Sequence, residues 1–203
     1  MSELIVKRQL QHNRYGAADW HIGHKKIWKP RGFNSLEEHD MGVLLPVFME
    51  LESKDTMIVA GDVFFGSPEE FAETLRKALA LSMKLKFNAK RIRPDERPTF
   101  NIKVVNGNHD SNAKLEYLKQ ERWITSYQMH MEEYIHGHPV VISHFPVHPI
   151  CLDRWHANGH GHIHSDFCKD PLDETKEDPR YRCMSWERYR KPMKLTDIFA
   201  HLA

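Results

Sequence analysis

Four short apolar runs, each followed at once by polar residues, constrain the fold of this 203-residue chain more than any other feature. The runs and the residues after them are RYGAA before Asp19-Trp20-His21, TMIVA before Gly61-Asp62, FNIKVV before Asn106-Gly107-Asn108-His109-Asp110, and PVVIS before His144. Apolar runs of this length are typical of strands buried on both faces. We therefore expect four central strands, each ending in side chains that can carry chemistry.

Helical patterns separate these runs. Residues 67–92 begin with Ser-Pro-Glu-Glu, a typical helix start, and continue with apolar residues at helical spacing. Residues 35–51 predict a second helix, kinked or split at Pro46, and residues 112–120 predict a shorter third one. Residues 94–98 and 169–180 indicate loops, the second acidic and mobile. Strands that alternate with helices in a chain of this length predict one α/β domain over residues 1–203.

The polar residues at the strand ends predict a ligand site. In open α/β sheets, ligands bind beyond the carboxyl ends of the strands. Strand ends also need polar turn residues, so one such end alone would carry little weight. Here all four ends bear Asp, Asn or His, which supply oxygen and nitrogen ligands for metal ions. A shared metal site explains this set better than turn chemistry does.

Residues 158–164, NGHGHIH, add histidines at alternate positions. In an extended conformation these histidines would all project to one side. The alternatives are an exposed histidine-rich turn and a structural zinc site, but structural zinc has four protein ligands, usually with Cys. The three cysteines, Cys151, Cys168 and Cys183, lack Cys-x-x-Cys spacing. Carboxylates, an amide oxygen and imidazoles together suit Mn²⁺, Fe or Zn²⁺ in an open catalytic site.

In this order, Asp-x-His, Gly-Asp, Gly-Asn-His-Asp, His and Gly-His-x-His resemble the motifs of the calcineurin-like metallophosphoesterase family. The match runs from Asp19 to His164, and DWHIGHKKI is especially similar to the small bacterial and phage members. The resemblance implies a four-layer α/β fold in which two mixed β-sheets pack as a sandwich flanked by helices. It also implies a phosphoric ester hydrolase with a dinuclear metal site where the strand ends converge.

The resemblance further implies two sets of metal ligands joined by one bridging carboxylate. The first set would be Asp19, His21 and His164, the second Asn108, His144 and His162, and the bridge Asp62. The expected cofactors are two divalent ions, with Mn²⁺ preferred and Fe, Zn²⁺, Ni²⁺ or Co²⁺ as alternatives. The last motif allows two registers, His160 with His162 or His162 with His164. We prefer the second, because small members often read His-Gly-His-x-His.

Three residues are candidates for contact with the substrate: His24, Asn108 and His109. His109 directly follows the expected ligand Asn108, so it should reach the phosphate, where it could stabilise the transferring oxygens or protonate the leaving group. Asp110 is a second candidate catalytic residue that would orient His109 and keep it protonated. The alternative for Asp110 is a turn or helix cap, and the alternative for His24 is an ordinary loop histidine.

The second motif bears on the substrate. Protein phosphatases of this superfamily continue it as Gly-Asp-x-x-Asp-Arg-Gly, whereas this chain reads GDVFFGS and lacks the arginine that grips a phosphomonoester. The favoured function is a phosphodiesterase acting on nucleotide-like or other small phosphodiesters. The alternative is a phosphomonoesterase, either a small-molecule or a protein phosphatase. A non-catalytic docking scaffold of the same fold is a third alternative, but such scaffolds typically lose the histidine that His109 provides here.

Charge and composition limit the partners. The formal net charge of +1 predicts no general attraction to nucleic acid or to anionic membranes. Basic clusters at residues 84–97 and 182–191 could hold a nucleotide or a nucleic-acid strand, but a solvated helix end and tail explain them as well. Aromatic residues beside the motifs could stack a base, although such residues are more often core; they are Trp20, Trp28, Phe64 and Phe65.

The sequence also predicts a compartment. No apolar stretch approaches the roughly 20 residues that a membrane span needs, and residues 1–14 show no signal-peptide h-region. An odd number of cysteines argues against a disulfide framework and favours a reducing environment. We therefore expect a cytoplasmic protein without a membrane partner, and the sequence predicts no oligomeric state.

Overall fold

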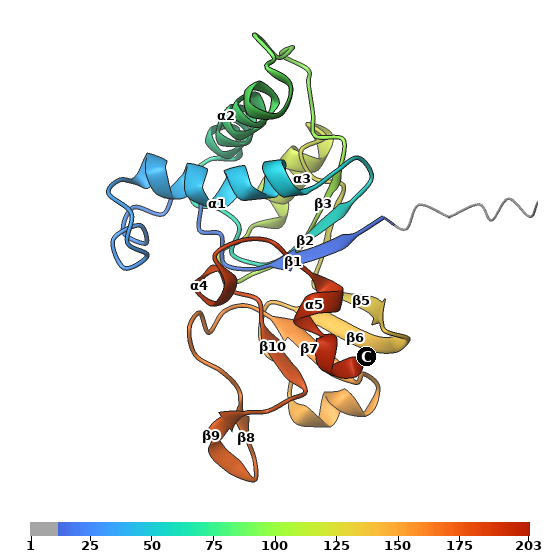
Figure 1. Cartoon of the computed structure of the whole chain (residues 1–203). Coiled ribbons are helices and arrows are strands. Elements are labelled where there is room, and N and C mark those ends of the chain that lie inside the picture. The colour runs from blue at the N-terminus through green and yellow to red at the C-terminus, as the bar shows by residue number, and fades with distance from the viewer. Residues whose placement is uncertain (1–11) are drawn as a thin grey trace, which may run out of the picture.

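The computed structural model describes residues 12–203, which form two mixed sheets, one small sheet and several helices (Figure 1). The signal-peptide pattern considered above falls almost wholly on residues outside this range. The first sheet has the order β11 (Met193–Lys194), β1 (Arg14–Ala17), β2 (Thr56–Ala60), β3 (Asn101–Val105) and β4 (Ser126–Gln128). The second has the order β10 (Tyr181–Cys183), β7 (Ala157–His160), β6 (His138–Ser143) and β5 (His130–Ile135). The four expected strands are confirmed as β1, β2, β3 and β6.

The three expected helices are also present, as α1 (Leu36–Glu50), α2 (Pro68–Phe87) and α3 (Asn112–Gln120). Pro46 lies inside the continuous helix α1, so of the two expected alternatives, a kink or a split, the split does not occur. Helix α2 begins with a capping box between Ser67 and Glu70, and it ends at Phe87 because Asn88 adopts a left-handed conformation, with φ 52°. Short helices follow later in the chain: η1 (Pro149–Asp153), α4 (Trp186–Tyr189), α5 (Leu195–Ile198) and η2 (Ala200–Leu202).

Alternate residues of β2 show how the layers are built. Ile58 and Ala60 are fully buried in a core that also holds Ile142 of β6, so this face of the first sheet packs on the second sheet. Met57 and Val59 point the other way, into a core shared with apolar residues of α1, α2 and α3. Because successive side chains of a strand point to opposite faces, both faces of the strand are buried. The two sheets therefore form a sandwich, with three helices on the outer face of the first.

The outer face of the second sheet differs from the expected architecture. A small apolar cluster of Val141, Leu152 and Tyr181 lies there, and Leu152 belongs to the short 3₁₀ helix η1. Within residues 12–203, no long α-helix contributes to this cluster. The expectation of helices flanking both sheets was thus correct for the first sheet only.

Residues 169–180 were expected to be a mobile loop, and this expectation was wrong. They contain a two-stranded hairpin of β8 (Lys169–Asp170) and β9 (Asp173–Glu177). The carboxylate of Asp170 accepts a hydrogen bond from the backbone N–H of Leu172 at 2.8 Å, which closes the turn. The residues of the hairpin are exposed or half-buried, and most of them are polar. They therefore lack the apolar alternation from which a strand is predicted.

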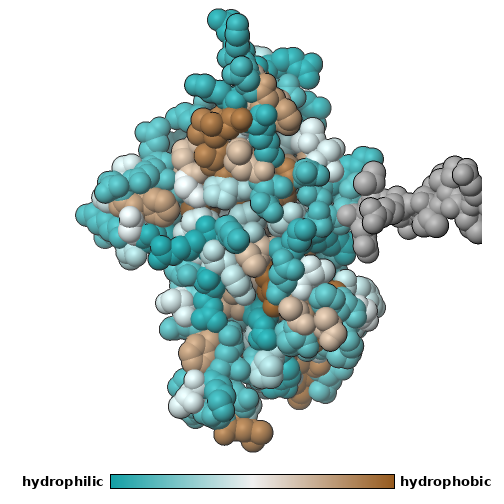
Figure 2. All heavy atoms as spheres, viewed as in Figure 1, coloured by the Kyte–Doolittle hydropathy of each residue, from teal (hydrophilic) through white to brown (hydrophobic). Residues whose placement is uncertain are grey.

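The face of the molecule seen in Figure 2 is largely hydrophilic, with smaller apolar patches between the polar areas. In the part of the chain described by the structure, no helix is both long and apolar enough to cross a membrane.

Two leucines of α2 provide a test of this packing. Leu75 is 1% exposed and contributes to the helix–sheet core, whereas Leu85 is 57% exposed. Leu75→Ala should lower the free energy of unfolding by about 2–5 kcal/mol because it removes buried methyl groups and leaves a cavity. Leu85→Ala should change it by no more than about 0.5 kcal/mol. Urea unfolding followed by circular dichroism measures both, and equal effects would contradict the assigned face of α2.

Candidate metal centre

Loops that follow strands of both sheets converge on one site. Asp19 follows β1, Asp62 follows β2, and Asn108 follows β3, while His144 follows β6 of the second sheet. The structure brings candidate ligands together in two groups: Asp19, His21 and His164, and Asp19, Asp62 and His144. In each group the candidate ligand atoms lie within 4.8 Å of one another. The polar residues after separate strands therefore form one cluster.

The buried imidazole of His21 tests whether a cation fits this cluster. Its Nε2 lies 3.8 Å from Asp19 Oδ1 and 3.7 Å from Asp62 Oδ2, too far for hydrogen bonds. Both ring nitrogens are buried and have no hydrogen-bond partner among residues 12–203. Buried polar atoms are normally paired. A metal ion bound between this imidazole and the two carboxylates would give the ring nitrogen the partner that it lacks.

His144 supplies a second, independent sign of a cation. Its Nδ1 lies 2.9 Å from the carbonyl oxygen of Ala60, which can only accept, so Nδ1 carries the proton. In the neutral ring, Nε2 therefore presents a lone pair, and it lies 2.8 Å from Asn108 Oδ1 and 3.5 Å from Asp62 Oδ1. Three electron-rich atoms that face one another at these distances could hold a metal ion.

The two later histidines lie on the cluster side. The ring of His162 lies 5.1 Å from that of His144, and the ring of His164 lies 5.1 Å from that of His21. His160 points elsewhere: its Nε2 lies 3.7 Å from the sulfur of Cys168, and burial lowers its pKa to about 4. This geometry favours the register His162 with His164. It also corrects the expected extended conformation, because both residues have positive φ, at 70° and 53°.

Left-handed backbone recurs throughout the cluster. Positive φ angles near 50° occur at Asp19, His21 and Asp62, which are not glycines. Such conformations are uncommon for side-chain-bearing residues and persist where the surroundings enforce them, often at functional sites. Two glycines permit the close packing: a Cβ at Gly61 would lie 2.3 Å from His144 Nδ1, and one at Gly107 would lie 2.3 Å from Asp62 Oδ1.

Hydrogen bonds hold the two carboxylates in place. Asp19 accepts the backbone N–H of His162, at 3.2 and 3.0 Å to its two oxygens, and the hydroxyl of Ser185. Asp62 Oδ1 accepts the backbone N–H of His109 at 3.0 Å. The loops after β7, β3 and β10 thus orient carboxylates that follow β1 and β2.

Two alternatives were expected for Asp110: orientation of His109, or a local role in a turn or helix cap. The hydrogen bonds of Asp110 do not support the first. Its oxygens accept the backbone N–H groups of Asp62 and Gly107, both at 2.8 Å, and of Val63 at 3.0 Å. Burial raises the pKa of Asp110, and these hydrogen bonds oppose the rise. Its role is therefore the structural one, a clamp between the loops after β2 and β3; the helix cap of α3 is Ser111.

A buried network behind the cluster was not anticipated from the sequence. Glu187 Oε1 lies 3.0 Å from His164 Nδ1 and accepts Arg31 Nε at 2.9 Å. Arg31 also donates to the carbonyl oxygens of Asp19 at 2.7 Å and Trp20 at 3.1 Å. Burial raises the pKa of Glu187, but His164 and Arg31 lower it more strongly, so the pKa lies below its ordinary value. With Nδ1–H donated to Glu187, His164 keeps Nε2 free for the cluster.

The same network continues through two residues of α1. Arg31 Nη1 lies 3.0 Å from His39 Nε2, and His39 Nδ1 lies 2.8 Å from Asp40 Oδ1. Asp40 in turn accepts the backbone N–H of Gly23 at 3.0 Å. Nothing in the sequence indicated this network. Arg31 and Glu187 lie 156 positions apart, and no motif or spacing pairs residues over such a distance.

The candidate substrate residues lie at the open side of the cluster. His109 is 49% exposed, and its Nε2 lies 4.0 Å from Asp62 Oδ2. His24 packs edge-on against Phe65, with ring centroids 4.5 Å apart, and Phe65 lies 4.9 Å from His109. Of the other aromatic candidates, Trp20 and Phe64 are buried in the core. Phe65 therefore lies beside the site, as does Phe145, whose ring lies 4.9 Å from that of His144 and 4.4 Å from that of His162.

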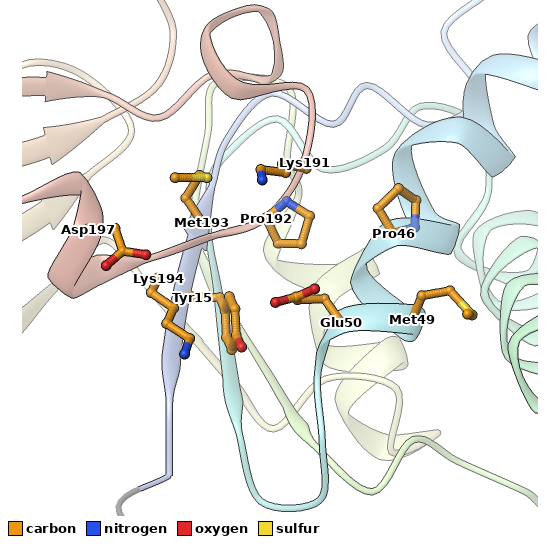
Figure 3. A pocket seen from close by; sticks show the side chains of 9 residues that line it. All are labelled: Tyr15, Pro46, Met49, Glu50, Lys191, Pro192, Met193, Lys194 and Asp197. Carbon is orange, nitrogen blue, oxygen red and sulfur yellow. The ribbon is translucent and has the colours of Figure 1, made fainter. Parts of the chain in front are cut away.

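Not every pocket belongs to this cluster. A small pocket of about 250 Å³ lies between the C-terminal part of α1 and the segment that contains β11 (Figure 3). Figure 3 shows Glu50, Lys194 and Asp197 around it, together with Tyr15 of β1. None of the candidate metal ligands lines this pocket.

Comparisons with known proteins establish the fold but not the function. The chain matches no protein-family model and no curated protein. It is similar in structure to AQ665 from Aquifex aeolicus, a protein of unknown function, with 21% identity and a TM-score of 0.61 over 94% of this chain and 100% of that one. A novel archaeal phosphodiesterase is more distant, with 17% identity and a TM-score of 0.41 over 85% of this chain and 82% of that one. The likeness to AQ665 shows a shared fold.

Glu187→Gln tests the network behind His164. The substitution keeps the shape but removes the charge that orients and polarises the imidazole, so the affinity for Mn²⁺ should fall by about tenfold or more. Isothermal titration of the metal-free protein with Mn²⁺ measures the affinity, and circular dichroism checks the fold. The matched control is Glu174→Gln in the exposed hairpin. Equal affinities of the two variants would show that Glu187 does not act on the metal site.

Proposed function

We propose that this chain is a metal-dependent phosphoesterase of the calcineurin-like type, and that its substrates are nucleotide-like or other small phosphodiesters. The observation that carries the proposal is the position of Asp62. One of its oxygens lies 3.7 Å from His21 and the other lies 3.5 Å from His144. A carboxylate between two separate imidazoles suits a bridge between two cations, since such a bridge calls for an anion.

The proposed ligand sets follow from this bridge. Asp19, His21 and His164 would hold one divalent ion, with Mn²⁺ as the first choice, and Asn108, His144 and His162 would hold the second. When bound, two such ions supply positive charge for the phosphate oxygens and lower the pKa of a water molecule. The neutral Asn108 binds through its carbonyl oxygen without adding negative charge. The two carboxylates therefore leave the site with net positive charge, which attracts an anionic ester.

His109 is the proposed acid and phosphate contact. Its backbone N–H is held by Asp62, while about half of its ring is exposed at the open side of the cluster. From there the imidazole can donate a hydrogen bond to a phosphate oxygen and pass a proton to the departing alcohol. Asp110 contributes indirectly, because its clamp on the loops after β2 and β3 fixes the backbone that carries His109.

Arg31 supports a diester over a monoester. A monoester dianion benefits from a free guanidinium, and the second motif lacks the arginine that protein phosphatases use. The guanidinium of Arg31 is buried and is already bound to two carbonyl oxygens and to Glu187. It is therefore not free to grip a phosphate, and the site suits the single charge of a diester. A phosphomonoesterase is the alternative function.

Two chromogenic esters test the proposal. With Mn²⁺ present, bis-p-nitrophenyl phosphate should be hydrolysed with a higher kcat/KM than p-nitrophenyl phosphate. Treatment with a chelator should abolish both activities, and added Mn²⁺ should restore them. The opposite ranking would favour the phosphomonoesterase. No turnover of either ester with Mn²⁺, Ni²⁺, Co²⁺ or Zn²⁺ would favour a docking scaffold.

Two substitutions should separate catalysis from metal binding. His109→Ala should lower kcat by about 10²–10⁴-fold while the metal content stays at the parent level, because the lost group is an acid rather than a ligand. Asp62→Asn should lose metal as well as activity, since it removes the bridging charge. Metal analysis and bis-p-nitrophenyl phosphate turnover measure both effects, with the exposed His130→Ala as the control. Parent-like turnover in both variants would refute the assignment.

A further inference from the structure

A pocket of about 1070 Å³ adjoins the candidate metal centre. It lies between the loop after β1, which contains Gly23, His24 and Lys25, and the N-terminal half of α2, which contributes Phe71 and Thr74. Ligand pockets in proteins commonly measure about 300–1,000 Å³, so this one has room for a group as large as a nucleoside. Nothing described above uses it.

Two aromatic rings connect this pocket to the centre. His24 and Phe65 line it, and their rings pack edge-to-face at 4.5 Å. The other side of Phe65 approaches the centre: its ring lies 5.3 Å from His21 and 4.9 Å from His109. A ligand bound with its phosphorus near His109 would therefore extend past Phe65 into the pocket. His24 and Phe65 thus line the pocket and also lie next to residues of the cluster.

The chemical character of the pocket is mixed. Ile22, Leu36 and Phe71 supply apolar walls beside Phe65. Lys25, Lys26 and Lys77 also line the pocket, and none of them forms an ion pair within residues 12–203. Three glutamates line it as well: the exposed Glu69, Glu70, which accepts the backbone N–H of Ser67 at 3.0 Å, and Glu73, which pairs with Arg76 at 3.3 Å. The lysines and glutamates of the rim therefore balance in charge, and the apolar walls suit a flat apolar ring.

We infer that this pocket binds the organic group of the substrate, and that this group is a nucleoside whose base packs against Phe65. The inference rests on the proposed phosphodiesterase function and names the substrate class of that site. Bases stack on aromatic side chains irrespective of their identity, and a rim whose charges balance suits the uncharged nucleoside. A small ester without the nucleoside would reach the centre but leave the pocket unfilled.

Two esters with the same leaving group isolate this contribution. Thymidine 5′-(p-nitrophenyl phosphate) and methyl p-nitrophenyl phosphate differ only in the group that the pocket would hold. With Mn²⁺, the parent protein should show a kcat/KM about tenfold or more higher for the thymidine ester, equivalent to about 1.4 kcal/mol. Thr74→Trp fills the pocket and should reduce this preference by about tenfold. The control is Thr175→Trp in the exposed hairpin, which should keep the preference.

The outcomes separate this inference from the proposed function. Turnover of both esters without preference, or the same preference in Thr74→Trp and Thr175→Trp, would overturn the nucleoside pocket and leave the phosphodiesterase intact. Turnover of neither ester would overturn the phosphodiesterase. In that case, calorimetric titration with thymidine 5′-monophosphate decides whether the pocket binds a nucleoside. Binding to the parent that is lost in Thr74→Trp supports it, and no binding to the parent refutes it.

Discussion

Two buried carboxylates that share one space determine the arrangement of the site. The ligand oxygens of Asp19 and Asp62 belong to a group whose atoms lie within 4.8 Å of one another, and both side chains are almost fully buried. Buried like charges repel unless hydrogen bonds or cations compensate them. Backbone N–H groups, Ser185 and three nearby imidazoles surround this pair, and His21 has no partner of its own. The cluster is therefore one that could hold a metal ion.

The surrounding structure holds this unfavourable arrangement in place. Left-handed backbone at Asp19, His21 and Asp62 would be uncommon in an isolated loop. Arg31 bonds to the carbonyl oxygens of Asp19 and Trp20, and Asp110 bonds to the N–H groups of the loop after β2. Each clamp is a buried charged group with several partners, so each can enforce a strained conformation more firmly than a neutral turn could.

The two sides of the centre differ in chemistry. Behind it, the buried Arg31 and His39 and the partly buried Glu187 form a network in which the guanidinium of Arg31 is bound to Glu187, His39 and backbone carbonyl oxygens. In front, His109, His24 and Phe65 are partly exposed, and His24 and Phe65 line a large pocket that also has three lysines and three glutamates in its lining. The division separates residues that orient the candidate metal ligands from residues that are open to solvent beside them.

The sequence by itself determined four central strands, the helices α1, α2 and α3, and the polar residues at the ends of those strands. These features follow from local patterns: apolar runs, helical spacing, and Asp, Asn or His placed directly after a strand. Only the tertiary structure decided the pairing of Arg31 with Glu187 and the clamp formed by Asp110. It also decided that His162 and His164 lie on the cluster side and that residues 169–177 form a hairpin. Those contacts join segments far apart in the chain, or depend on backbone hydrogen bonds that polar side chains do not reveal, so no local pattern encodes them.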